Sequence, residues 1–395
     1  THFIDYVSLL VVDHPADEEV FVDERFAREA PALAVHAVKN VRPVAHAWDQ
    51  AGRDVTDVVS ARDGRYLSTF PRGPYQGIAQ DHFVEIDLGE EIRGPERPAL
   101  QQVARPFQGR QWLIANGWIY PTDSSINVAI AQAGIQPHGL SLEAQDASGR
   151  WTVVAPDLGF PAGKNKTILI DLGQVARAGI SHVRRVRLRT NLEIYWDSLA
   201  VADAAADDTI ETTRVRASKA ELRYRGFSKT DFSRRDVPEI PHYGELANVG
   251  QRWRDLVGYY TRYGNVSELL TSVDDRYVIM NAGDELRLSF PEAAAPEPVA
   301  PKRDDEATAR RRAEADRRRT RDFVLIGDGW EKDGDYNTTY SKTVEPLPRH
   351  GHPNYEAERP VENIEDDPVY RAHPADWQRY HTRFVAPDVF LNGLR

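Results

Sequence analysis

The chain has 395 residues, of which 41% are hydrophobic and 28% charged, which is enough for two or three domains with buried cores. Its net charge of −11 excludes nucleic acid as the main partner, because a phosphate backbone needs a basic face. The absence of cysteine excludes disulfides, cysteine-bound zinc, iron–sulfur clusters and covalently attached c-type haem.

Short runs of β-branched and aromatic residues recur up to about residue 205, separated by turn residues. In residues 183–189, valine and leucine alternate with arginine, with one shift of register, which is typical of a strand with one buried face. We expect a mainly β protein of antiparallel β-sandwiches, of jelly-roll or galactose-binding-like type, with few short helices. The predicted strands are residues 6–12, 82–88, 111–119, 126–130, 152–155, 167–172, 183–188 and 192–196.

Two similar turns separate predicted strands. Asp49 and Gly52 precede an arginine, and Asp146 and Gly149 do the same. Because glycine accepts positive φ and aspartate closes a local turn, both segments predict hairpins.

Residues 211–290 form a second β-rich region, with strands predicted at 220–224, 277–281 and 285–290. Residues 245–260 are predicted as a helix, because their apolar residues share one helical face. Residues 291–301 are rich in alanine, proline and glutamate and predict an extended linker. A charged helix is expected over 304–321; it has no apolar residue larger than alanine, so a neighbouring molecule would have to order it.

The last segment is dense in glycine, proline, aspartate, histidine and aromatic residues, and we expect it to lie extended over a surface. It contains one predicted strand, at 323–326, and one predicted short helix, at 374–380, with proline at its first position. The predicted segments are an N-terminal β segment (1–45), a β-sandwich domain (46–210), a second β-rich region (211–290), a Pro/Ala linker with a charged helix (291–322) and an extended C-terminal segment (323–395).

One motif suggests a metal site. Asp333, Asp335 and Asn337 have the spacing that begins an oxygen-ligand calcium loop. The sixth loop position is Thr338 instead of glycine and the twelfth is Val344 instead of glutamate, so a strand followed by Asp-Gly turns is the competing interpretation. His350 and His352 form a second, weaker candidate, with Glu356 and Glu358 nearby. We expect no cofactor, with calcium as the one candidate ion.

Two groups of residues are candidates for binding. Tyr195, Trp196 and Asp197 could stack on a sugar or anchor a protein if they are exposed, although large rings in a sandwich are more often core. The basic residues of the charged helix could contact a partner. They are Arg310, Arg311, Arg312, Arg317, Arg318 and Arg319.

Catalytic motifs are missing from the sequence. It has no Walker loop, no G-x-G-x-x-G, no G-x-S-x-G elbow and no H-E-x-x-H. We therefore predict that the protein is not an enzyme. A hydrolase whose carboxylates meet only in the fold remains an alternative.

Three segments carry a resemblance to known proteins: YVIMNAGDEL at 277–286, DFVLIGDGWEKDGDYN at 322–337 and DPVY at 367–370. They resemble the C-terminal region of exported bacterial FG-GAP/ASPIC-UnbV (cartilage-acidic-protein-like) proteins, although this chain lacks the propeller repeats and the UnbV segment. The resemblance implies an extracytoplasmic location and a role in adhesion or assembly. Residues 80–205 are also similar to galactose-binding-like β-sandwiches, which would imply carbohydrate recognition.

The leading hypothesis is a non-catalytic, extracytoplasmic (periplasmic) scaffold that binds protein subunits of a larger bacterial complex. It would be peripheral to a membrane and reach it only through its partners; a photosynthetic reaction centre with its antenna is one conjectural setting. The alternatives are a carbohydrate-binding module and the hydrolase described above.

Overall fold

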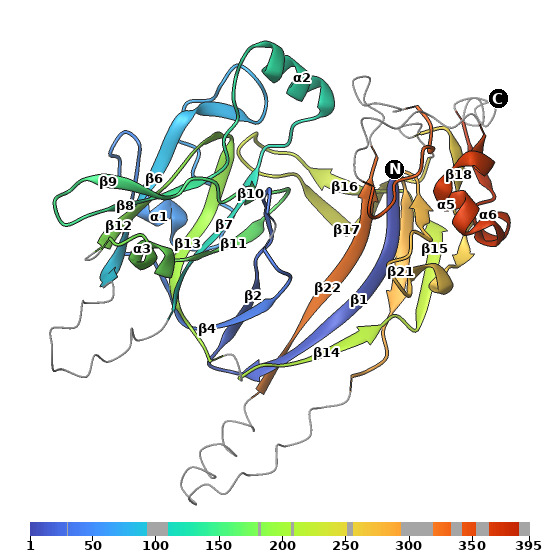
Figure 1. Ribbon diagram of the computed structural model, residues 1–395, viewed down its shortest axis with the longest axis horizontal. Coiled ribbons are helices and arrows are strands. Elements are labelled where there is room, and N and C mark those ends of the chain that lie inside the picture. The colour runs from blue at the N-terminus through green and yellow to red at the C-terminus, as the bar shows by residue number, and fades with distance from the viewer. Residues whose placement is uncertain are drawn as a thin grey trace, which may run out of the picture.

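The computed structural model in Figure 1 describes residues 1–29, 31–92, 110–180, 183–206, 209–250, 256–293, 319–332, 342–352 and 363–386. Over these residues the chain is mainly β, with several antiparallel sheets and only a few short helices, which confirms the predicted fold class. No helix in these ranges is long and apolar enough to cross a membrane.

Two five-stranded antiparallel sheets form a sandwich, on the left in Figure 1. The first sheet has the order β11 (Lys166–Asp171), β7 (Gln111–Ile119), β13 (Ile194–Ala204), β4 (Val35–Pro43) and β2 (Glu19–Val22). The second has the order β5 (His46–Asp49), β6 (Ile78–Ile92), β12 (Val183–Leu192), β8 (Ser141–Gln145) and β9 (Trp151–Ala155). One core joins them, with Leu113 and Leu199 from the first sheet and Ile86 and Leu188 from the second.

Local patterns in the sandwich follow the sequence closely. The pairing of β12 with β6 shifts register between Val183 and Arg185, where the alternation predicts a shift. Gly149 has a φ of 85° and donates its N–H to the carbonyl of Asp146, which forms the predicted turn between β8 and β9.

One predicted strand of the sandwich is wrong. Residues 126–130 lie in the helix α2 (Ser124–Gln132), because the Asp123 carboxylate accepts the Ile126 N–H at 2.7 Å and caps the first turn. The remaining elements of this part are short: α1 (Thr56–Val59), α3 (Gly173–Arg177), β3 (Arg25–Phe26) and β10 (Phe160–Pro161).

The second lobe is built around the N-terminal strand β1 (His2–Pro15). Along one edge β1 pairs with β14 (Glu211–Arg216) and β20 (Val278–Met280), and along the other with β22 (Arg319–Glu331). The sandwich is therefore inserted in the sequence between two neighbouring strands of the second lobe. The strand predicted at 323–326 is part of β22, which continues to Glu331.

A second layer covers part of this sheet. It consists of β19 (Gly264–Asn265), β15 (Lys219–Tyr224) and β21 (Asp284–Ser289). Its Leu222 shares a core with Val7 of β1 and Val278 of β20. A two-stranded ribbon follows, made of β16 (Phe227–Asp231) and β17 (Ile240–Asn248).

The helix predicted over 245–260 is wrong. Residues 245–248 belong to β17 and residues 258–260 to β18 (Gly258–Tyr260), while residues 251–255 lie outside the described residues. The apolar Leu246 and Val249 have helical spacing but are exposed, so no core face is available to stabilise a helix.

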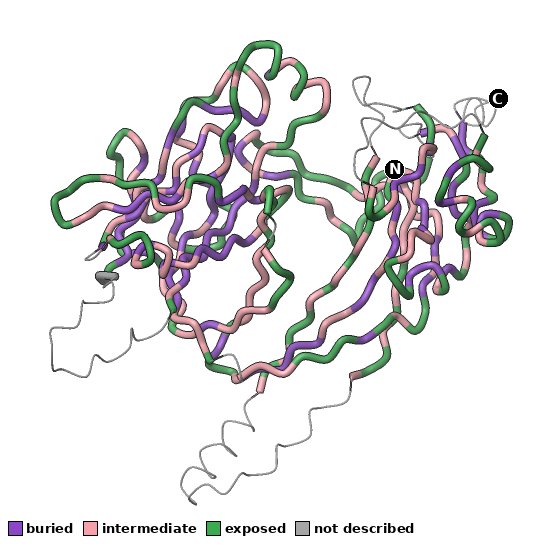
Figure 2. Tube along the Cα trace, viewed as in Figure 1, coloured by how far each residue is buried: buried purple, intermediate pink, exposed green. Residues whose placement is uncertain are grey.

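The C-terminal part is folded into the second lobe. It contains η3 (Ile364–Asp366), α5 (Pro368–Ala372), α6 (Pro374–Tyr380) and β23 (Arg383–Val385), which pairs with β18; η1 (Ser267–Leu270) lies nearby. The helix predicted at 374–380 is confirmed. Residues 363–372, for which an extended conformation was expected, instead form η3 and α5, and Val369, Trp377 and Tyr380 are buried. Figure 2 shows buried and exposed positions mixed along this part of the chain. Most of the linker and the charged helix, residues 294–318, lies outside the described residues.

Candidate functional site

The aromatic candidates on β13 are core residues. Tyr195, Trp196 and Asp197 are 0%, 4% and 5% exposed, so the condition for a binding role, that they are exposed, is not met and the core interpretation holds. The Tyr195 ring stacks on Trp118, with the ring centroids 5.2 Å apart. Asp197 accepts the backbone N–H of Gly64 at 3.0 Å and so holds a neighbouring turn.

Tyr195 instead helps to dock the ribbon. Its hydroxyl donates to the buried carboxylate of Glu193 at 2.5 Å, and burial raises the pKa of Tyr195. Arg235, from the turn between β16 and β17, donates to the same carboxylate through Nε at 2.9 Å and Nη2 at 2.8 Å. This bidentate pair fixes the far end of the ribbon to the sandwich.

Of the predicted basic residues only Arg319 is described. Its guanidinium donates to the carbonyl of Asp13 at 2.6 Å and lies 3.6 Å from Glu211, so it joins β22 to β1 and β14. Arg310, Arg311, Arg312, Arg317 and Arg318 lie outside the described residues, as do Asp333, Asp335, Asn337, Glu356 and Glu358.

An open groove of about 1070 Å³ lies in the second lobe and is here called the β22 groove. Leu325 and Gly327 of β22 form part of its lining, together with Leu286 and Leu288 of β21. Tyr243 of the ribbon lines it as well. The groove therefore joins three elements that are far apart in the sequence.

The groove exposes large apolar side chains. Leu325 is 62% exposed and Tyr243 77% exposed, and Phe323, on the same face of β22 as Leu325, is 60% exposed. Figure 2 shows exposed positions alternating along β22 and continuing over much of the ribbon. Further exposed apolar residues of the ribbon and its flanks are Phe232, Ile240, Leu246 and Val249. Apolar groups gathered in this way mark surfaces that bind other molecules.

Two glycines of β22 have different surroundings. A Cβ on Gly329 would lie 2.2 Å from the carbonyl oxygen of Phe3, so close packing of β22 on β1 requires glycine. A Cβ on Gly327 would meet nothing within 4 Å. Packing within the described part of the chain therefore gives no reason for glycine at position 327, which lines the groove.

A cluster of charged groups lies beside the groove and is called the His350 cluster. Asp5 occupies a β-bulge between Ile4 and Tyr6, where the pairing of β1 with β22 shifts register. The imidazole of His350 lies 2.7 Å from Asp275, 3.0 Å from Asp328 and 3.7 Å from Asp5. It thus links β1, β22 and the turn before β20.

Three carboxylates surround the imidazole of His350. Burial alone would lower the pKa of His350, but hydrogen bonding to Asp275 and the nearby carboxylates raise it above its usual value. Burial raises the pKa of Asp5 to about 6, against the opposing effect of backbone N–H donors. Asp5 accepts three such donors, from Asp274, Asp275 and Arg276, at 3.0 to 3.2 Å.

The same residues include a set of metal-ligand type. One ligand atom from each of Asp5, Asp328 and His350 can be chosen so that all lie within 4.8 Å of one another. Both imidazole nitrogens nevertheless face carboxylates, which is the arrangement of an imidazolium that donates twice. The sequence predicted His350 as a metal-ligand candidate. No local sequence pattern indicated Asp5, because the β-bulge in β1 brings it to the cluster.

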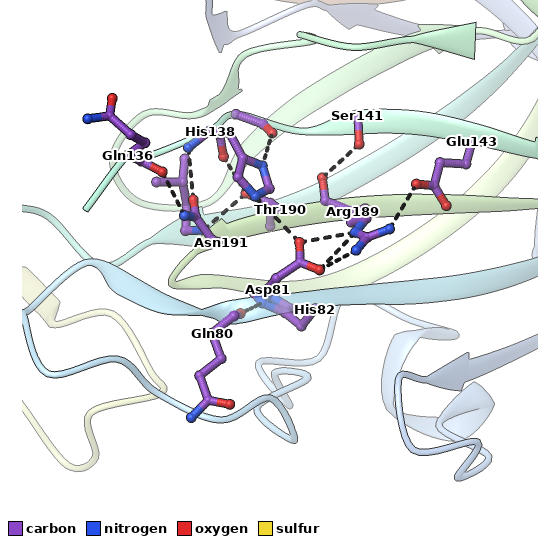
Figure 3. Close-up of polar contacts among 12 residues, drawn as sticks. Gln80, Asp81, His82, Gln136, His138, Ser141, Glu143, Arg189, Thr190 and Asn191 are labelled. Atoms are coloured by element: carbon purple, nitrogen blue, oxygen red, sulfur yellow. Dashed lines mark hydrogen bonds and ion pairs between the residues drawn. The ribbon is translucent and has the colours of Figure 1, made fainter. Parts of the chain in front are cut away.

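The outer face of the second sandwich sheet carries paired charges and aromatic rings. In Figure 3 Arg189 donates to Asp81 at 2.9 and 3.0 Å and to Glu143 at 3.4 Å, and His138 lies 3.4 Å from Asp81. Further along β12, the guanidinium of Arg187 lies 4.0 Å from the ring centroid of Phe83 and 3.8 Å from that of Trp151. These arginines already have acidic or aromatic partners, so this face is a self-neutralised surface.

Comparison with known proteins adds no identification. No protein-family model matches the chain, and a search of curated proteins finds no match. The groove and the His350 cluster therefore carry the functional argument.

Proposed function

We propose that this protein is a non-catalytic, extracytoplasmic scaffold that binds protein subunits of a larger assembly through the β22 groove. The observation that carries the proposal is the exposure of Leu325 and Tyr243 in one groove, with Phe323 exposed on the same face of β22, because soluble surfaces rarely gather such side chains without a partner. Contact with a membrane would occur only through these subunits. A photosynthetic reaction centre with its antenna is one setting that would suit this role.

The geometry of the His350 cluster favours binding over hydrolysis. A general base needs a free lone pair within reach of substrate. Asp5 is fully buried and accepts three backbone N–H groups, and both nitrogens of His350 face carboxylates. The cluster therefore acts as a clamp that holds one end of the groove in shape.

A carbohydrate-binding role is the second candidate, at a site other than Tyr195 and Trp196. A hollow of about 400 Å³ on the outer face of the sandwich is lined by Trp48 and Phe83 together with Glu85 and Arg185. An aromatic ring beside charged groups is a common sugar platform. The guanidinium of Arg185 lies 4.8 Å from the Trp48 ring centroid and occupies one stacking position, which weakens this candidate. A glycan array with the wild type and Trp48→Ala tests it; a signal lost in the variant would favour sugar binding.

The test of the scaffold is gentle purification of the tagged full chain from its native source, followed by mass spectrometry. We expect defined protein subunits to co-purify with the wild type. Leu325→Lys places a charge in the groove and should reduce their recovery at least about tenfold, equivalent to about 1.4 kcal/mol. Because Leu325 is exposed, the variant should keep the wild-type melting temperature.

The matched control is Val153→Lys, which adds the same charge at an exposed apolar position on β9 of the sandwich. It should leave co-purification unchanged. A wild-type chain recovered alone, or equal recovery with both variants, would contradict the proposed function.

A further inference from the structure

Two strand edges meet at the β22 groove. Within the described residues, β21 pairs with β15 along one edge only, and β22 pairs with β1 along one edge only. An unpaired edge presents a row of backbone N–H and C=O groups that a further strand can satisfy. The groove thus has backbone groups available to hydrogen-bond an extended chain.

The two layers of the second lobe differ in width at this point. The layer of β19, β15 and β21 covers β1 and β20, since Leu222 packs with Val7 and Val278. Leu286 and Leu288 of β21 end this cover at the groove, and Leu325 of β22 stays 62% exposed beside them. The layer of β19, β15 and β21 therefore leaves β22 of the other sheet uncovered, with room beside β21 for one more strand.

We propose that the groove receives one extended segment of a partner protein, which adds as a strand to β21 and covers β22. This inference rests on the proposed function and specifies the form of the partner. Strand addition obtains affinity from main-chain hydrogen bonds and selectivity from pockets for alternate side chains.

Gly327 supports this form of binding. A glycine inside a strand weakens the strand and often marks a place where another backbone approaches closely. Its Cβ would project into open space, so a side chain there would fill the groove without disturbing β1. An added strand would occupy the space that a side chain at position 327 would take.

The lining predicts the sequence of the bound segment. Apolar side chains at alternate positions would face Leu325 and Leu288. Four carboxylates line the groove, and three of them have a cation within the chain: Asp284 has Arg383, Glu285 has Arg225, and Asp328 has His350. Glu331, at the end of β22, has no ion pair among the described residues, so a lysine or arginine of the segment would complete it.

The experiment uses the full chain and two pools of synthetic ten-residue peptides of equal composition. One pool alternates apolar and polar residues and ends with lysine; the other spaces the apolar residues three and four apart, as in a helix. The protein variants are the wild type, Gly327→Val to fill the groove, and Thr213→Val as a matched control on exposed β14. Binding is measured by fluorescence polarisation, and amide hydrogen exchange is followed over 284–289.

We expect the wild type and Thr213→Val to bind the alternating pool at least about tenfold more tightly than Gly327→Val does. The helix-spaced pool should bind no better to the wild type than to Gly327→Val. The alternating pool should also protect backbone amides of β21 from exchange, because main-chain hydrogen bonds form there.

Strand addition is overturned if the alternating pool has no advantage, if Gly327→Val binds it equally, or if the β21 amides stay unprotected. Should these results coincide with co-purification that Leu325→Lys abolishes, the groove binds a partner of another form and the proposed function stands. Should co-purification fail as well, both proposals are wrong.

Discussion

Arg235 and Glu193 form a bidentate ion pair that joins the turn of the β16–β17 ribbon to the sandwich, at 2.9 and 2.8 Å. Glu193 is fully buried and also accepts from Tyr195 and from the N–H of Gly77. The ribbon, which lines the β22 groove, is thereby attached to both lobes. The groove's shape thus depends on a contact outside it.

Removing Arg235 should destabilise the protein, because it leaves a buried carboxylate with fewer donors. We expect Arg235→Ala to lower the free energy of unfolding by about 2 to 3 kcal/mol. Arg235→Lys should retain only part of the free energy of unfolding that Arg235→Ala loses, since lysine cannot donate in a bidentate fork. Urea denaturation measures both. The control is the adjacent Arg234→Ala, which removes the ion pair of Arg234 with Asp236. Because the Arg234 side chain is largely exposed, this variant should lower the free energy of unfolding by less than about 1 kcal/mol.

The two glycines of β22 predict opposite responses to one substitution. Gly329→Ala should cost about 2 kcal/mol or more, because its Cβ would meet the Phe3 carbonyl oxygen at 2.2 Å. Gly327→Ala should stay within about 0.5 kcal/mol of the wild type or be slightly more stable, because its Cβ meets no atom within 4 Å. Thermal and urea unfolding of the two variants measure these changes. Equal decreases in the free energy of unfolding would contradict the packing of β22 on β1.

His350 predicts a pH-dependent contribution to stability. The pKa of His350 is raised in the folded state, so protonation of the imidazole favours folding. This stabilisation is fully present below the pKa of the unfolded chain, about 6.5, and is lost as pH rises through the pKa of the folded state. The free energy of unfolding of the wild type should exceed that of His350→Gln by about 0.5 to 1 kcal/mol at pH 5.5 to 6. The difference should shrink towards pH 9. Urea denaturation across this range checks it, and a constant difference would mean that the imidazole acts only by packing.

Trp377 tests whether the C-terminal part belongs to the core. It packs in one cluster with Phe3 and Tyr260 and is 7% exposed. We expect Trp377→Ala to lower the free energy of unfolding by about 3 to 5 kcal/mol. His352→Ala, in a loop outside the helices, serves as the comparison and should change it by much less. A stable Trp377→Ala protein would show that this segment is accessory.

The packing of the C-terminal part into the second lobe makes its deletion a poor test of a scaffold role. Deleting residues 291–395 would remove β22, the neighbour of β1 over its whole length, together with Trp377. Loss of partners after such a deletion would follow from unfolding as much as from a lost interface. Single substitutions at Leu325 and Gly327 separate these two causes.

Local chemistry accounts for the features that the sequence predicted correctly. The turn at Asp146 and Gly149 and the helix at 374–380 each depend on residues within a few positions of one another. The sequence of α2 also predicts a strand, because Ile126, Val128 and Ile130 alternate with Asn127 and Ala129 and so short a run fits either period. The cap at Asp123, just before them, was the signal that distinguished the two.

The sequence by itself determined the mainly β class and the positions of many turns and strands, because backbone propensity and side-chain alternation are local properties. Tertiary structure alone decided that β1 lies between β14 and β22 and that Asp5 meets His350. It also decided that Tyr195 is core while Leu325 is exposed. Pairing between distant strands is selected by packing across the whole molecule, which a single local pattern does not encode.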